Sequence, residues 1–154
     1  MKNVERVPGT NFRALHSGNH GKYGNPHEQY KRVYRKASAA ANLTVNSTTP
    51  TPWMQTTFTC PSPSMYEVEV YLDFLPSGGD GILTASVAVD GGAAEPKLIA
   101  VSNTVAARIP IFRKWITSQL TEGSHTIVVS IWRTSGTSTF TCYSSNSELI
   151  VTGP

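Results

Sequence analysis

The residues of this chain that could bind a metal ion or transfer a proton are concentrated near its N-terminus. His16, His20 and His27 lie in a segment rich in glycine, and His27 belongs to the sequence NPHEQY. Imidazole nitrogens bind transition metals and exchange protons near neutral pH. The i, i+4 spacing of His16 and His20 matches a helical zinc motif, but the nearby glycines disfavour a helix and no Glu supplies the general base.

The rest of the chain has few residues in a catalytic pattern. It contains no Gly-x-Ser-x-Gly elbow, phosphate loop or nucleotide fingerprint. Asp73, Asp80 and Asp90 fall at expected strand ends and turns, where a solvated Asp is usual, and calcium binding in these Gly-Asp loops is the alternative. His125 directly precedes an expected strand, which indicates an edge or turn role. We therefore expect a protein that is not an enzyme and has no cofactor.

Two cysteines, Cys60 and Cys142, complete the set of reactive side chains. Neither is surrounded by metal-ligand spacing. Each lies near the end of an expected strand. We expect two separate buried thiols, and a disulfide inside the folded body is the alternative.

The charge of the chain is unevenly distributed. Residues 1–40 have a net charge of +6, whereas the remainder has a net charge of −3. Glycine and proline interrupt the basic residues, so nucleic-acid binding is not expected, although tyrosines lie among them. The pattern indicates an extended arm that is solvated or docks on an acidic neighbour. Residues Gln29 to Lys36 could form two helical turns with Tyr30, Val33 and Tyr34 on one face.

The body of the chain has the turn-rich pattern of an all-β protein. We assign 1–40 to the arm, 41–52 to a linker or first strand containing Leu43 and Val45, and 53–154 to a β-sandwich domain. The expected strands are Trp53 to Cys60, Met65 to Phe74, Ile82 to Val89, Lys97 to Val101, Ala106 to Phe112, His125 to Trp132, Thr137 to Tyr143 and Glu148 to Thr152. The segment from Arg113 to Leu120 could be a helix or a loop.

The strand from Met65 to Phe74 has the clearest alternation. Val68, Val70 and Leu72 alternate with Glu67, Glu69 and Tyr71, so one face belongs in a core and the other faces water or an interface. About eight such strands, spaced eight to twelve residues apart, predict an antiparallel two-sheet sandwich of the jelly-roll type.

Two segments resemble known phage proteins. The PHEQY sequence and the histidines before it resemble the His-rich Asp/Asn-Pro-His-x-Gln-Tyr motif of tail fibres, baseplate appendages and minor tail proteins of tailed bacteriophages. Residues Phe58 to Val68 and Leu120 to Ile127 look like the strand-turn-strand pattern of phage virion sandwich domains related in shape to the tumour-necrosis-factor and C1q jelly rolls. Such proteins are commonly homotrimers that build or decorate virions.

The resemblance implies a structural virion protein, a homotrimeric tail appendage or minor tail protein whose arm docks on the particle. A capsid decoration or head fibre protein is one alternative, and a carbohydrate-binding module that recognises a host-surface glycan is another. We find no apolar h-region of a secretory signal and no membrane-spanning run, and expect synthesis in the host cytoplasm and location in the virion. The partners implied are two further copies of the chain and other virion proteins.

The resemblance also assigns roles within the arm. The assembly motif comprises Asn25, Pro26, His27, Gln29 and Tyr30. The residues expected to dock the arm are Arg13, His16, His20, Tyr23, Lys31, Arg32, Tyr34 and Arg35. On a threefold axis, one His27 from each chain would place three imidazoles near one point, where they could bind a metal ion. The interpretation that we favour is that His27 and Tyr30 make ordinary hydrogen bonds in an arm that wraps a partner.

Overall fold

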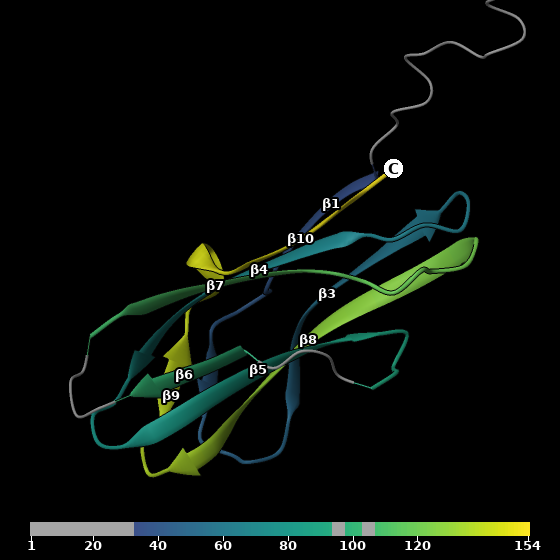
Figure 1. Cartoon of the computed structure of the whole chain (residues 1–154). Coiled ribbons are helices and arrows are strands. Elements are labelled where there is room, and N and C mark those ends of the chain that lie inside the picture. Colours follow the sequence, from purple (N-terminus) through teal and green to yellow (C-terminus); the bar gives the residue numbers. More distant parts are fainter. Residues whose placement is uncertain (1–32, 94–97, 103–106) are drawn as a thin grey trace, which may run out of the picture. The chain divides into compact units, whose positions relative to one another are not determined.

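The computed structural model describes residues 33–93, 98–102 and 107–154, which form a sandwich of two antiparallel sheets (Figure 1). Six strands make the first sheet, here called the β4 sheet: β1 (Val33–Ser38), β10 (Glu148–Gly153), β4 (Glu67–Pro76), β9 (Phe140–Cys142), β2 (Leu43–Val45) and β7 (Ile109–Ile116). Four strands make the second, the β8 sheet, in the order β3 (Thr51–Cys60), β8 (Gly123–Gly136), β5 (Gly81–Val89) and β6 (Leu98–Ser102). The predicted all-β antiparallel sandwich is confirmed.

Helical structure is limited to one short turn in this part of the chain, a 3-10 helix at Ser144–Asn146. None of the described residues form a helix of the length and hydropathy needed to cross a bilayer.

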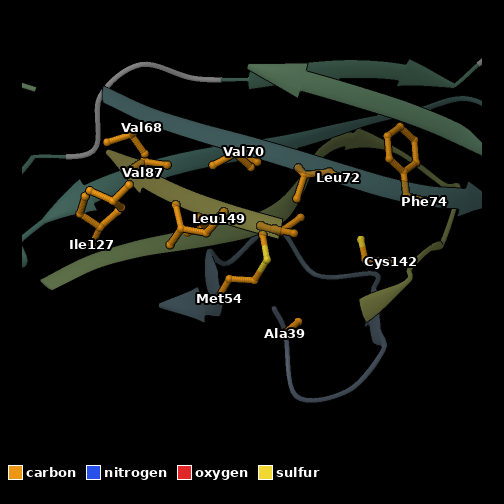
Figure 2. Packing of buried hydrophobic residues seen from close by; sticks show 14 of the residues in the cluster. Ala39, Met54, Val68, Val70, Leu72, Phe74, Val87, Ile127, Cys142 and Leu149 are labelled. Atoms are coloured by element: carbon orange, nitrogen blue, oxygen red, sulfur yellow. The ribbon is translucent and has the colours of Figure 1, made fainter. Parts of the chain in front are cut away.

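Strand β4 lies in the middle of its sheet because its alternate residues are apolar. Val68, Val70, Leu72 and Phe74 are all buried between the sheets, as the alternation predicts (Figure 2). On its two sides β4 pairs with β10 and β7. The outward residues of β4 therefore form one continuous surface with the outward residues of these two neighbours.

The second layer of the core comes from the β8 sheet. Its buried apolar side chains are Met54, Phe58, Leu83, Ala85, Val87, Ile127, Val129 and Ile131. They face the β4 sheet, which adds Leu149 and Val151 from β10 (Figure 2). Complete burial of an apolar side chain stabilises a fold by about 1.5–3 kcal/mol, so this layer holds the two sheets together.

The glycine-rich turns occur where the sequence predicts them. Gly78 and Gly79 have φ angles of +99° and +82° before β5, and Asp90 and Gly91 have φ angles of +51° and +70° after it. Asp is among the residues that adopt a positive φ at a modest cost. The turn at Asp90 brings its carboxylate close to the start of β8.

The N-terminal boundary of the sandwich differs from the prediction. Residues 33–38, which we assigned to the arm and partly to a helix, form strand β1 along the whole length of β10. The predicted helix is therefore wrong at residues 33–36. Two helical turns are marginal in isolation, whereas the edge of β10 offers backbone partners to an extended segment.

Two further elements correct the predicted boundaries. Strand β7 continues to Ile116, so the first half of the undecided segment from Arg113 to Leu120 is a strand that pairs with β4. Pro52 lies inside β3 and does not precede it, at an irregularity in the pairing between β3 and β8. A proline is tolerated there because β3 is an edge strand.

Candidate functional site

The outward surface of β4 and β7 is the feature of the described residues best suited to a contact with another protein. On β4 the outward side chains near its start are Glu67, Glu69 and Tyr71, and the exposed Met65 lies just before the strand. On β7 they are Phe112, Lys114 and Ile116. We call these seven residues the β4–β7 face. The pairing places Tyr71 opposite Phe112 and Glu67 opposite Ile116.

Large apolar side chains on this face are open to solvent. The exposed fractions are 38% for Tyr71, 50% for Phe112, 64% for Ile116 and 60% for Met65. The Tyr71 and Phe112 rings contact each other with centroids 4.6 Å apart. Exposed apolar side chains gathered on one surface mark a site of association, and aromatic residues are enriched in such sites.

The charges on the face neutralise one another. The Lys114 ammonium lies 2.8 Å from a Glu67 carboxylate oxygen and 3.5 Å from one of Glu69. Both carboxylates raise the pKa of Lys114, and the hydrogen bond to Glu67 has the largest effect. On the neighbouring strands Lys36 and Glu148 are paired in the same way at 2.5 Å. The face can therefore be covered by another protein surface without a large excess of one charge.

At the far end of β4, Asp73 is the centre of a buried polar cluster. Its carboxylate accepts hydrogen bonds from the Arg108 guanidinium and, at 2.8 Å, from the Asn146 amide. The Arg108 guanidinium also lies 4.2 Å from the centre of the Tyr143 ring. Only 10% of the Asp73 side chain is exposed, so the expectation of a solvated Asp is wrong at this position. The cluster ties the end of β4 to the 3-10 turn.

At the opposite end of the sandwich, His125 connects two loops. Its Nδ1 lies 2.6 Å from Asp90 Oδ2, and its Nε2 lies 2.8 Å from the Thr121 carbonyl oxygen. Asp90 also accepts a hydrogen bond from the Thr126 backbone N–H at 2.7 Å. The contact with Asp90 raises the pKa of His125, and hydrogen bonding to His125 lowers the pKa of Asp90. His125 lies inside β8, opposite Phe58 of β3, so the expectation that it precedes a strand is wrong, although its side chain contacts both loops. Asp90 has partners within the protein.

The two cysteines are separate free thiols, both buried. The Cys60 thiol donates a hydrogen bond to the Ser62 carbonyl oxygen at 2.9 Å. Burial, followed by the negative charge of Asp73, raises the pKa of the Cys142 thiol to about 12. The alternative of a disulfide between them is wrong, because each side chain lies in its own part of the core.

Most residues that the sequence assigns to assembly lie outside the described residues. These are Asn25, Pro26, His27, Gln29 and Tyr30 of the motif, and Arg13, His16, His20, Tyr23, Lys31 and Arg32 of the arm. Tyr34 and Arg35 belong to β1, opposite Thr152 and Val151, and the Arg35 side chain is exposed. Among residues 33–93, 98–102 and 107–154, no three His, Cys, Asp or Glu side chains gather as metal ligands would.

The tryptophans are distributed over both sheets. Trp53 on β3 and Trp115 on β7 are half-buried against the core, and the Trp53 indole N–H donates to the Ala41 carbonyl oxygen at 2.9 Å. Trp132 is half-buried on β8. They do not form the shared aromatic platform on which sugars stack.

Sequence reasoning missed Phe112, Ile116 and Arg108. Phe112 and Ile116 alternate with the half-buried Ile111 and Trp115, and this period of two continues into the segment that we left undecided. That alternation could have revealed the strand. The contact between Arg108 and Asp73 joins the residue before β7 to β4 and leaves no local signal in the sequence.

These strands and their order define the class of the protein, an antiparallel β-sandwich of the jelly-roll type. No protein-family model matches the chain, and no curated protein matches its sequence. Among solved structures, the tumour-necrosis-factor protein Eiger from S. frugiperda superposes with a TM-score of 0.53 at 11% identity, covering 80% of this chain and 92% of that one. The structure of infectious bursal disease virus Gt strain superposes with a TM-score of 0.55 at 12% identity, covering 80% of this chain and 33% of that one.

This chain therefore spans about a third of the viral chain that it resembles. At such low identities the similarity concerns the fold. The chain has a jelly-roll sandwich of the kind found in tumour-necrosis-factor-like proteins and in a viral structure.

Proposed function

We propose that this protein is a structural component of a bacteriophage virion, a homotrimeric minor tail or tail-appendage protein. Its N-terminal arm docks on the particle, and its sandwich is displayed outward. The single observation that carries the proposal is the β4–β7 face, which offers a surface for contact with another protein. The described residues of the sandwich contain no catalytic arrangement.

The composition of the face suits contact with identical chains. Tyr71 and Phe112 are amphipathic or apolar rings, and rings of this kind supply much of the energy of protein contacts when water is excluded from them. Around a threefold axis the same face of each copy would meet its neighbours, which also fits the neutral balance of Lys114 with Glu67 and Glu69. The β8 sheet would then be directed away from the axis.

The arm supplies the second part of the proposal. Residues 1–32, which precede β1, have a net charge of +4 that suits an acidic docking surface on the particle, and their PHEQY motif resembles one found in phage tail proteins. Within a trimer, His27 is the residue that would approach the axis. The proposed location of the protein is accordingly the virion.

A capsid decoration or head fibre protein is the second candidate. The exposed β4–β7 face and the basic residues before β1 suit docking on a capsid surface as well as on a tail. A glycan-binding module is less favoured because the tryptophans do not share one surface. Electron microscopy of intact particles with the labelled protein distinguishes a tail from a capsid position.

The experiment that tests the proposal compares the full chain with a variant that lacks residues 1–31. This deletion stops before β1, so we expect both proteins to fold and to sediment as trimers. We expect the full chain to be incorporated into particles and the shortened chain to be absent from them. Sedimentation as a monomer would contradict the trimer, and normal incorporation of the shortened chain would contradict the docking role of the arm.

A further inference from the structure

The hydrogen bonds of His125 require a specific protonation state. Both of its ring nitrogens face oxygen atoms, one of the Asp90 carboxylate and one of the Thr121 carbonyl. An ionised carboxylate and a carbonyl can only accept hydrogen bonds, and a neutral imidazole has a single N–H. The doubly protonated imidazolium therefore satisfies both contacts, whereas the neutral ring leaves one nitrogen lone pair facing an oxygen.

The surroundings of the ring make this requirement strict. Only 9% of the His125 side chain is exposed, so water does not readily replace a lost partner. Phe58 of β3 lies opposite His125, with its ring centroid 6.1 Å away, and Tyr66 lies beyond Phe58. Among the described residues, Asp90 is the charged group in contact with the ring, and Glu122 on the preceding loop is exposed.

We propose that His125, Asp90 and the Thr121 carbonyl form a pH-sensitive latch, which holds the turn after β5 against the start of β8 most firmly while the imidazole is protonated and loosens when the proton is lost.

The direction of the pH response follows from the two partners. Hydrogen bonding to Asp90, then to Thr121, raises the pKa of His125 above its usual 6.5. The contribution of His125 is complete below pH 6.5 and is lost as the pH rises through the folded-state pKa. Hydrogen bonding to His125 lowers the pKa of Asp90 below its usual 3.8, so its contribution is present above pH 3.8 and is lost as the pH falls through the folded-state value. The latch is closed between these limits and loosens as the pH rises through the folded-state pKa of His125.

The turn that the latch holds is also the wall of a cleft. Beyond Asp90, the residues Gly92 and Ala93 line one side of a cavity of about 470 Å³, and residues 115–118 line the other. Asp90 is anchored by two backbone contacts with Thr126 in addition to His125. The neutral ring keeps one N–H, which can donate to Asp90 or to Thr121 but not to both, so loss of the proton weakens the hold on this turn while its two contacts with Thr126 remain.

Nuclear magnetic resonance of the full-length protein tests the latch directly. We expect the imidazole of His125 to carry protons on both nitrogens at pH 6 and to titrate above pH 6.5. A single protonated nitrogen at pH 6, or titration at or below pH 6.5, would overturn the proposal.

Hydrogen exchange in the same samples reports the opening of the turn. The test amides are those of Asp90 and Thr126, and the reference amides are those of Thr137 and Ser138, which both donate to the Asp80 carbonyl at the opposite end of β5. As His125 loses its proton, we expect protection of the test amides to fall about tenfold relative to the reference amides, the size expected for a charge-assisted hydrogen bond. A constant ratio across the titration would overturn the proposal.

The variant Asp90→Asn removes the negative charge and keeps a side chain that tolerates the positive φ of this position. We expect it to lower the pKa of His125 and to abolish the pH dependence of the exchange ratio. Asp80→Asn is the matched control in the other turn and should leave both unchanged. An unaltered His125 titration in Asp90→Asn would show that the carboxylate does not operate the latch, and the titration of the unmodified protein remains decisive if this variant does not fold.

Discussion

Tyr71 and Phe112 occupy directly opposed positions on β4 and β7, and their rings contact each other at an interplanar angle of 33° on the solvent side of the sheet. Each ring is more than a third exposed, yet each is already held by the other. A pair fixed in this way loses little conformational entropy when a second protein covers it. The pair is therefore an ordered platform for association.

If the protein forms the proposed trimer, replacing Phe112 with Asp should dissociate it without unfolding the sandwich. Half of the Phe112 side chain is exposed in the single chain, so the fold does not depend on its burial. In the trimer an added carboxylate would be desolvated, which should weaken association at least tenfold. Analytical ultracentrifugation measures the change in mass. The control is Gln55→Asp on the exposed side of β3. Equal dissociation of both variants would show that the β4–β7 face is not part of the interface.

Replacing Val70 with Asp should unfold the sandwich. Val70 is 2% exposed in the centre of β4 and packs in the apolar core, and Arg113, opposite it on β7, is exposed (Figure 2). Burial of an unpaired polar group costs several kcal/mol, on the order of the whole stability of a small domain. Circular dichroism during urea titration should show no cooperative transition. Tyr71→Asp, one residue away on the opposite side, is the control and should keep that transition.

The sequence predicted the parts of the fold that depend on local alternation and could not predict those that depend on pairing. The alternation within β4 predicts which of its side chains are buried, and the two glycines predict the turn at Gly78–Gly79. Strand β1 is short and polar, and its structure depends on β10, more than a hundred residues later. The contact between Arg108 and Asp73 likewise requires the register of β7 on β4.

The boundary at β1 predicts a difference between two deletions. Removal of residues 1–31 should leave the unfolding free energy of the sandwich unchanged within about 0.5 kcal/mol, because β1 stays intact. Removal of residues 1–38 deletes β1, the edge partner of β10, and exposes the core around Leu149 and Val151. The cost should be on the order of 3 kcal/mol from lost burial and backbone hydrogen bonds. Equal urea midpoints for the two deletions would show that β1 contributes little to the fold.

The buried thiols predict that the folded protein resists thiol reagents. Cys60 and Cys142 are 0% and 1% exposed, and the pKa of Cys142 is raised to about 12, so very little thiolate is available at pH 8. We expect no reaction with a chromogenic disulfide reagent in buffer and reaction of two thiols per chain in denaturant, without prior reduction. Fewer than two thiols in denaturant would instead indicate a disulfide.

The cluster around Asp73 predicts that Arg108 stabilises the fold although half of its side chain is exposed. In Arg108→Ala the Asp73 carboxylate stays buried and keeps the Asn146 amide as a partner, but it loses its positive charge. A buried charge that loses one partner costs about 1–3 kcal/mol, which should lower the urea midpoint of unfolding. Arg108→Lys keeps the positive charge but loses the paired guanidinium contacts with Asp73 and the stacking on Tyr143. Its urea midpoint should therefore lie between those of the unmodified protein and Arg108→Ala. The control is Arg113→Ala, which removes an exposed arginine within β7. A loss as large as that in Arg108→Ala would mean that removal of a positive charge near β7, and not loss of the contact with Asp73, lowers the stability.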